Sequence, residues 1–238
     1  MSDWLERTEL ILGEPGLMKL MAANVLVVGL GGVGAYAAEM ICRSGVGKMT
    51  IVDGDTITVS NRNRQLPALK STEGLPKAEV MANRLKDINP DLELVVINEY
   101  LKDARMEEVL DAGFGFVVDA IDTLSPKIFL ICHSIRRGIP VVSSMGAGGK
   151  FDPAMIRISD ISETTNCPLA RILRKRLHRL GIRDGFTAVY SPEAVDKSKI
   201  LAVEGQQNKA SIVGTISYMP AAFGIACASV VIRKLAEV

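Results

Sequence analysis

Apolar and amphipathic stretches alternate along residues 24–144. Two continuous apolar runs, NVLVVG (24–29) and KMTIVD (48–53), are typical of strands that are buried on both faces of a sheet. The stretch between them, residues 32–44, has small residues along one side and predicts a helix that ends near Gly45. A strand, a helix and a second strand in this order predict a βαβ unit.

The same alternation continues to residue 144. In PKAEVMANRLKDIN the apolar residues Ala78, Met81 and Leu85 recur at helical spacing, and Pro76 takes the favoured first position of the helix. Further strands are expected at LELVVI (92–97), FGFVVDA (114–120) and IPVVSS (139–144), and further helices near 104–111, capped by Asp103, and in SPKIFLICHSIRRG. This series predicts an α/β fold with a Rossmann-like, doubly wound and mostly parallel sheet.

The composition is that of an ordinary globular protein. The chain has 238 residues, 48% of them hydrophobic and 23% charged, which suits one sizeable domain. The net charge of +1 gives no overall attraction to nucleic acid, so any basic surface must be local. The first residues, MSDWLERTEL, include no apolar run, and no signal peptide is expected.

The most apolar late stretch, YMPAAFGIACASVVI, is about 15 residues long, shorter than the roughly 20 that a membrane span requires. We therefore expect a cytoplasmic protein without membrane contact. The four cysteines form no CxxC pair, which argues against a disulfide scaffold and against a structural zinc site.

The first predicted strand runs into GLGGVG, where Gly29, Gly31 and Gly34 form a G-x-G-x-x-G pattern that also contains Gly32. Such glycines allow a tight turn, and the helix that follows directs free N–H groups towards a phosphate. Asp53 ends the next strand, a position from which a carboxylate commonly binds ribose. The pattern predicts nucleotide binding without identifying the nucleotide, and a purely structural turn is the alternative.

Charged residues after the strands narrow the choice of nucleotide. The segment SNRNRQ (60–65) contains Arg64, Lys77 lies one residue into the next helix, and Asp122 follows the strand at 114–120. In a doubly wound sheet Asp53 and Asp122 should face one crevice from opposite sides. Cations that neutralise phosphate oxygens and an acid that holds a metal suit ATP with Mg²⁺ better than a nicotinamide cofactor. The alternative is that the cations are solvated surface charges.

Several stretches in the first half of the chain match one family of nucleotide enzymes. They are RTELILG, GLGGVG, VDGDTITVSNRNRQ, LPKAEVMANRLKDINP and VVDAIDTLSPK, in this order over residues 7–127. With them the chain resembles the ubiquitin-activating-enzyme-like adenylation family, which includes the bacterial activators of molybdopterin and thiamine sulfur carriers. The resemblance implies a single adenylation domain over residues 1–238, with a nucleotide-binding half over 1–150 and a C-terminal substrate-side extension over 151–238.

The resemblance also implies roles for individual residues. It assigns Asp53 to the ribose, Asn61, Arg64 and Lys77 to the phosphates, Asp122 to Mg²⁺, and Gln65 to a position behind the residues that contact the nucleotide. Arg7 matches the family's arginine finger, which reaches the phosphates of a neighbouring subunit. We therefore expect a homodimer.

The second half of the chain resembles one branch of this family. GAGGKFDP, CPLARILRKRL and AAFGIACASVVI are similar to the branch that modifies N6-threonylcarbamoyladenosine in tRNA. This similarity implies an ATP-dependent cyclisation, a net dehydration, in which the threonyl carboxylate is first joined to AMP. The neighbouring carbamoyl oxygen then displaces AMP and closes a five-membered oxazolone ring. Because that step is intramolecular, it requires no protein nucleophile.

Cys167 and the helix after it are the remaining candidates. Cys167 precedes a proline in a polar segment, so it is either a reactive thiol or an unreactive cysteine at a helix start, and we favour the second. The stretch RILRKRLHRLGIR has several cations and no acid, which suits an RNA backbone; they include Arg171, Arg174, Lys175, Arg176 and Arg179. Ile172, Leu173, Leu177 and Leu180 should dock this helix. A solvated polar face is the alternative.

Three functions are therefore compatible with the sequence. The favoured one is an ATP- and Mg²⁺-dependent tRNA-modifying dehydratase, with tRNA rather than DNA as its partner. The second is adenylation of the C-terminus of a ubiquitin-like sulfur-carrier protein, against which the missing CxxC pairs count. A nicotinamide oxidoreductase is disfavoured by SNRNRQ and Lys77. A sulfur-relay protein is a further possible partner, and residues 187–215 carry too weak a pattern for an assignment.

Overall fold

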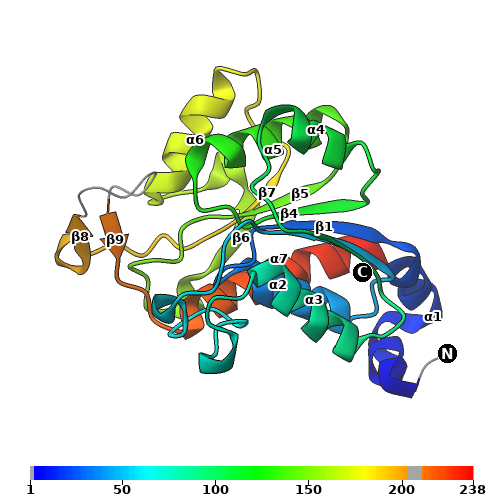
Figure 1. Ribbon diagram of the computed structural model, residues 1–238. Coiled ribbons are helices and arrows are strands. Elements are labelled where there is room, and N and C mark those ends of the chain that lie inside the picture. The colour runs from blue at the N-terminus through cyan, green and yellow to red at the C-terminus, as the bar shows by residue number, and fades with distance from the viewer. Residues whose placement is uncertain (1–2, 203–210, 238) are drawn as a thin grey trace.

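The computed structural model describes residues 3–202 and 211–237, and its centre is a seven-stranded sheet (Figure 1). The strands lie in the order β3-β2-β1-β4-β5-β7-β6. Their bounds are β1 Asn24–Val28, β2 Lys48–Val52, β3 Glu93–Ile97, β4 Phe116–Asp119, β5 Val141–Ser144, β6 Arg157–Asp160 and β7 Thr187–Tyr190. All neighbours are parallel except β6 and β7. The prediction of a doubly wound, mostly parallel sheet is confirmed.

Helices cover both faces of the sheet, as Figure 1 shows. Below it in that view lie α1 (Glu6–Ala22), α2 (Gly34–Arg43), α3 (Lys77–Ile88) and α7 (Tyr218–Ala236). Above it lie α4 (Asp103–Leu110), α5 (Leu124–Arg136) and α6 (Pro168–His178). Each layer encloses its own buried apolar cluster, because strands β1, β2, β4 and β5 alternate side chains between the two faces.

The last third of the chain is built into the same sheet. β7 pairs with β5 and brings β6 to the edge, and α7 packs against α2 and α1. The weak pattern at 187–215 therefore contains the strand β7, and the edge strand β6 has no clear sequence signal either. Both are short, and β6 leaves its side chains exposed or half-buried.

The helix α7 is 19 residues long, longer than its apolar stretch predicted. In the described part of the chain it is the one helix long and apolar enough to cross a membrane, judged by length and composition alone. Half of its apolar window is buried inside the fold, and Met219, Phe223 and Cys227 are completely buried. This is the arrangement of a core helix.

Some local predictions differ from the structure. Pro76 precedes α3 as its N-cap residue, in an extended conformation, rather than occupying the first helical position. Asp103 is the first residue of α4, and the helix has no side-chain cap at its start. The capping prediction for Asp103 is therefore wrong.

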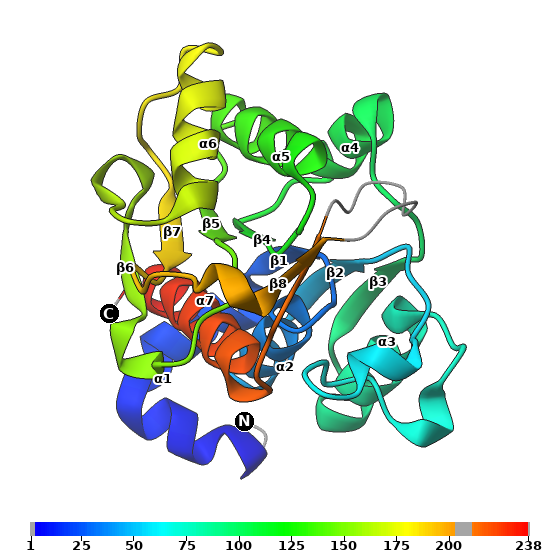
Figure 2. The same ribbon diagram turned by 90° about the vertical axis from the view of Figure 1, so that its left-hand side faces the viewer.

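The carboxyl ends of the parallel strands face the viewer in Figure 2. A small hairpin of β8 (Ile200–Ala202) and β9 (Ser211–Val213) lies in front of them in that view. Short 3₁₀ helices complete the described elements: η1 Asp3–Leu5, η2 Val59–Asn61, η3 Lys70–Thr72, η4 Pro153–Met155, η5 Ile161–Glu163 and η6 Lys197–Lys199.

Candidate functional site

The glycine-rich turn joins the carboxyl end of β1 to the start of α2. Gly29 has a φ of 90°, a left-handed conformation that a side chain would disfavour. A Cβ atom at Gly34 would lie 1.7 Å from the carbonyl oxygen of Gly29, so only glycine allows α2 to begin this close to the strand. The turn thus places the positive end of a helix at the sheet's carboxyl edge, where a phosphate is favoured.

Asp53 follows β2 directly and contacts this turn. Its carboxylate accepts hydrogen bonds from the backbone N–H groups of Leu30, at 2.6 Å, and Asp55, at 2.8 Å. Burial raises the pKa of Asp53, while the charge of Lys77 and these two N–H donors act in the opposite direction. The carboxylate is therefore fixed beside the glycine-rich turn, as expected for a ribose ligand at the end of a second strand.

The SNRNRQ segment packs onto the same turn. A Cβ at Gly32 would lie 3.3 Å from the backbone oxygen of Arg64, and one at Gly31 would lie 3.6 Å from Gln65 Nε2. Arg64 is half-buried, and its guanidinium donates to the backbone oxygen of Ser60 and to Asn63 Oδ1. Gln65 Oε1 is buried without a hydrogen-bond partner in the described structure, which leaves an acceptor for a bound group.

Asn61 is also buried, but its carboxamide oxygen accepts a hydrogen bond from the backbone N–H of Thr58, 3.1 Å away. This bond caps η2 and shapes the SNRNRQ segment. The structure therefore gives Asn61 a local backbone role in addition to the phosphate contact that the family resemblance implies.

A buried lysine and a tyrosine converge on Asp55. Lys77 Nζ lies 2.6 Å from Asp55 Oδ2, and the Lys77 side chain is only 5% exposed. Tyr100 donates its hydroxyl to Asp55, which raises the pKa of Tyr100 to about 12. The carboxylates of Asp53 and Asp122 contribute to the same rise in pKa. Asp53 follows β2 and Asp122 lies in the loop after β4, so both carboxylates are at the carboxyl edge of the sheet, on the two strands that flank β1.

Sequence reasoning missed Asp55 and Tyr100. Asp55 stands in the DGD turn, and no pattern in the sequence pairs it with Lys77. Tyr100 follows β3, the next strand along the sheet edge, and a polar side chain just after a parallel strand is the pattern that could have indicated it.

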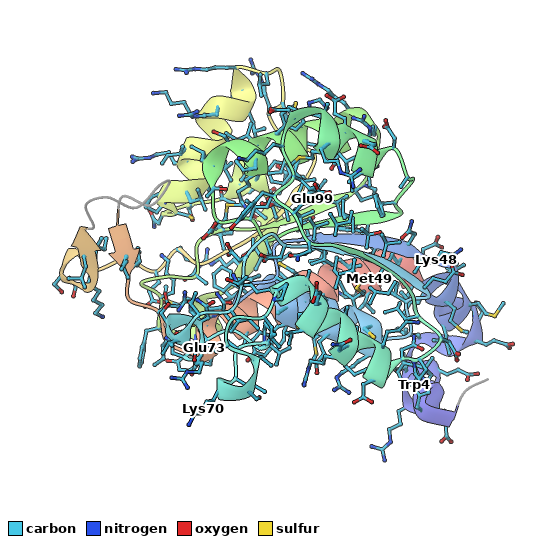
Figure 3. All side chains as sticks on the ribbon, viewed as in Figure 1. Trp4, Lys48, Met49, Lys70, Glu73 and Glu99 are labelled. Carbon is cyan, nitrogen blue, oxygen red and sulfur yellow. The ribbon has the colours of Figure 1, made fainter. Side chains whose placement is uncertain are left out.

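Arg7 lies away from the residues at the carboxyl edge of the sheet. It is exposed on α1, next to Leu5, which packs against Gly45 before β2. Residue Gly47, just before β2, likewise contacts Met21 at the end of α1. Figure 3 shows Trp4 and Lys48 at this end of the molecule, far from Lys70 and Glu73 at the other. Within one chain Arg7 therefore lies at the amino ends of the strands, opposite the nucleotide site.

The basic helix α6 docks on α5 through a narrower apolar face than the sequence predicted. Ala170, Leu173 and Leu177 are buried, whereas Ile172 and Leu180 are 42% and 47% exposed. Including the last two in the docking face was wrong. Ile172 lies one position to the side of the buried row, and Leu180 follows the end of α6, so both face solvent.

Arg174 also departs from the prediction that the cations of this helix suit an RNA backbone. Its guanidinium donates to the backbone oxygens of Thr164, at 2.9 Å, and Ile161, at 3.3 Å, and to the Thr164 hydroxyl. Arg174 therefore ties α6 to η5. The other cations assigned to RNA lie exposed: Arg171, Lys175, Arg176 and Arg179.

The cysteines in the structure are all free and buried. Cys167 is the N-cap residue of α6, as its position before proline predicted, and only 7% of it is exposed. Burial raises the pKa of Cys42 to about 11 and that of Cys227 to about 12, so these two thiols remain protonated. The structure is consistent with core roles for Cys42, Cys132 and Cys227.

The described residues contain no group of three or more His, Cys, Asp or Glu side chains that could hold a metal ion. A protein cage for a metal is therefore absent from this part of the chain. Mg²⁺ with ATP does not require one, because it is usually held by one or two carboxylates together with phosphate oxygens. The carboxylate of Asp122 beside the glycine-rich turn fits that donor set.

A depression of about 390 Å³ lies elsewhere, between Phe116, Val141, Thr187 and Lys234. The first three of these residues open strands β4, β5 and β7, so the depression is at the amino edge of the sheet. It is therefore separate from the site at the carboxyl edge, where ligands of doubly wound folds bind.

Comparisons with known proteins agree with this geometry. The family model described as ThiF family matches residues 5–238, so the chain belongs to the ThiF family. The resemblance to adenylating enzymes is thereby confirmed.

Two proteins similar to this chain share a name that is narrower than the family. The tRNA threonylcarbamoyladenosine dehydratase of Escherichia coli (strain K12) is 35% identical over 98% of this chain and 94% of that protein. The enzyme of the same name from Bacillus subtilis (strain 168) is 43% identical over 79% of this chain and 74% of that protein. The solved structure of the E. coli enzyme in complex with ATP has a TM-score of 0.89, 35% identity, and coverage of 98% of this chain and 96% of that one.

Proposed function

We propose that this protein is an ATP-dependent enzyme that dehydrates N6-threonylcarbamoyladenosine in tRNA through an adenylated carboxylate. The observation that carries the proposal is the similarity to tRNA threonylcarbamoyladenosine dehydratases over nearly the full chain, with an ATP complex among the matching structures. The carboxyl edge supplies the chemistry: a glycine-rich turn, a buried lysine, a half-buried arginine and carboxylates from two strands.

The first step joins the threonyl carboxylate to AMP. A carboxylate oxygen attacks the α-phosphorus of ATP, and pyrophosphate leaves. Arg64 and Lys77 neutralise charge on the phosphates, and Asp53 holds the ribose beside the glycine-rich turn. Preorganised charges of this kind lower the barrier because they need not reorganise as negative charge develops.

Asp122 is the residue that would hold Mg²⁺ in this proposal. Mg²⁺ bound there and to the triphosphate would act as a Lewis acid that neutralises the reacting phosphate. Asp122 is exposed in the loop after β4, and the preceding residues of this loop, Ala120 and Ile121, lie against Gly29 of the glycine-rich turn.

The second step closes the ring. The carbamoyl oxygen attacks the activated carboxyl carbon, and AMP leaves. The carbamoyl nitrogen then loses its proton to solvent. No covalent enzyme intermediate is needed, which agrees with the burial of Cys167. Ring closure as written therefore consumes no sulfur, and a sulfur-relay protein stays a possible partner without a role in this step.

Arg7 would complete the site from a second subunit. It lies at the wrong end of its own chain, so it could contact phosphates only in a neighbouring one. Beside it on α1, Leu10 and Ile11 are each 81% exposed, and such apolar side chains favour a protein–protein contact. A homodimer that buries this part of α1 against the partner's nucleotide site satisfies both observations.

The tRNA backbone would lie along α6. Arg171, Lys175, Arg176 and Arg179 form an exposed set of cations, and phosphate contacts of this kind supply affinity without sequence specificity. Arg174 is not part of this surface, because its guanidinium is engaged with η5. An enzyme of this class would act in the cytoplasm, where tRNA is found.

The test is mass spectrometry of nucleosides from tRNA incubated with purified protein. With ATP and Mg²⁺, tRNA that carries N6-threonylcarbamoyladenosine should yield a nucleoside lighter by one water, and AMP should accumulate in step. tRNA without the modification should give neither product. Consumption of ATP only in the presence of a carrier protein ending in Gly-Gly would instead support the alternative function, adenylation of that carrier.

A further inference from the structure

A completely buried ion pair lies directly behind the loop that carries Asp122. Lys127, from the first turn of α5, places Nζ 2.8 Å from Asp119 Oδ2, and the two side chains are 1% and 0% exposed. Burying two charges is unfavourable unless their remaining hydrogen-bonding groups are also satisfied. The proposed chemistry uses neither residue.

Two further hydrogen bonds of the pair converge on a single residue of the loop. Lys127 Nζ donates to the backbone oxygen of Ile121, 3.0 Å away, and Asp119 Oδ1 accepts from the backbone N–H of Ile121, 3.1 Å away. Ser143 on the neighbouring strand β5 donates to Asp119 Oδ2 at 2.6 Å. Both backbone polar groups of the residue before Asp122 are therefore held by the buried pair.

The same loop is in close contact with the glycine-rich turn. A Cβ at Gly29 would lie 2.7 Å from the backbone oxygen of Ala120 and 3.3 Å from the nitrogen of Ile121. A Cβ at Gly34 would lie 3.0 Å from the Cβ of Ala120. These two glycines therefore do more than admit a phosphate: they let the Asp122 loop approach the phosphate-binding turn.

We propose that Lys127 and Asp119 are positioning residues that clamp Ile121 against the glycine-rich turn and thereby aim the Asp122 carboxylate at a nucleotide-bound divalent cation. This inference rests on the proposed function, in which Asp122 holds Mg²⁺. A polar partner behind a metal-binding carboxylate typically contributes tenfold to a hundredfold to metal affinity or activity, so the effect should be measurable.

The experiment measures ATP affinity by calorimetry, with Mg²⁺ and with EDTA, for purified variants. Lys127→Met should reduce the Mg²⁺-dependent gain in ATP affinity by at least about tenfold. Affinity in EDTA should change by less than about twofold, because the glycine-rich turn itself is intact. Lys127→Arg, which keeps the charge, should retain most of the gain.

A double-mutant cycle shows whether Lys127 acts through Asp122. If it does, Lys127→Met added to Asp122→Ala should change the Mg²⁺-dependent gain no further, because the effects of coupled residues are not additive. Additive effects in folded variants would overturn the proposal. The proposal would also be overturned if Lys127→Met kept the full Mg²⁺-dependent gain in ATP affinity. It would be overturned as well if the ATP affinity of the wild-type protein did not depend on Mg²⁺.

Two further variants separate positioning from stability. Glu39→Gln weakens the ion pairs of another buried carboxylate, with Arg43 and Arg84 outside the site, and should leave the Mg²⁺-dependent gain unchanged. If Lys127→Met fails to fold, Ser143→Ala keeps the ion pair and should still reduce the gain in the same direction; an unchanged gain would overturn the proposal. None of these measurements uses tRNA, so a failure of tRNA dehydration with intact Mg²⁺ coupling would contradict only the proposed function.

Discussion

The carboxyl edge of the sheet and the exposed face of α6 hold their charges in opposite ways. At the sheet edge, Lys77, Asp53 and Asp55 are buried or half-buried, and hydrogen bonds fix each of them. On α6, Arg176 and its exposed neighbours extend into solvent. Fixed charges can stabilise one transition state, whereas mobile charges provide attraction over a surface.

Arg174 shows that a charge fixed by hydrogen bonds and charges exposed to solvent can lie on the same helix. It belongs to the basic sequence of α6, but its guanidinium is bound to backbone oxygens of η5. It therefore behaves like the fixed charges of the sheet edge, although it serves packing rather than chemistry. The comparison predicts that substitutions at the edge affect turnover, while those on α6 affect tRNA affinity.

The largest effect should follow the loss of a charge at the sheet edge. Asp122→Ala and Arg64→Ala should each lower turnover by about 10²–10³-fold, because each removes stabilisation of charge in the transition state. Steady-state release of AMP measures the loss, and circular dichroism checks the fold. Arg62→Ala changes an exposed cation of the same segment and should retain the wild-type rate. Equal rates for all of these proteins would remove the sheet edge from the mechanism.

Arg7 should behave as a sheet-edge charge supplied by another subunit. Arg7→Ala should be nearly inactive, and so should Asp122→Ala, when each is assayed alone. After subunit exchange, a mixture of the two should recover about a quarter of the wild-type rate, because half of the dimers then contain one complete site. No recovery, despite demonstrated exchange, would place Arg7 outside the partner's site.

Within α6, two arginines should separate affinity from stability. Arg176→Glu should weaken tRNA binding several-fold and flatten its dependence on salt, because one phosphate contact is lost. Arg174→Ala should leave tRNA binding near wild type and lower the free energy of unfolding by about 1–3 kcal/mol, since buried backbone oxygens lose their donor. Filter binding at two salt concentrations and urea denaturation measure the two quantities. Equal tRNA affinities for wild type and Arg176→Glu would exclude the exposed face from binding.

The smallest effect is expected at Cys167. Cys167→Ser should keep most of the cyclisation activity on modified tRNA, because ring closure is intramolecular and the thiol is buried at the start of α6. The assay is the dehydrated nucleoside measured by mass spectrometry. Complete loss of product with ATP binding intact would indicate a covalent thiol intermediate.

The sequence predicted strands best where both faces of a strand are buried. The strands β1, β2 and β4 are continuous apolar runs because both of their faces are covered, and their order around β1 follows from the βαβ pattern. The sequence was less informative for β6, whose side chains are exposed or half-buried, and for β7, whose buried run is only residues 188–190. Neither strand forms the long apolar run that marks a strand covered on both faces.

The candidate site could likewise be predicted only in part. The glycines and the residues that follow strands could be placed because parallel strands end at one edge of a sheet. The partners of those residues could not: neither the bond from Tyr100 to Asp55 nor the inward turn of Arg174 has a local signal. The first joins the ends of two strands, β2 and β3, and the second joins α6 to η5, so both depend on how separate elements pack.

The central claim is that the threonyl carboxylate is activated by transfer to AMP. It is tested most directly with tRNA whose threonyl carboxylate oxygens carry ¹⁸O. The account predicts one ¹⁸O atom in each AMP released together with the cyclised nucleoside, because the carboxylate oxygen that attacks the α-phosphorus leaves with it. Cyclised product accompanied by ADP and labelled inorganic phosphate, or by unlabelled AMP, would contradict adenylation.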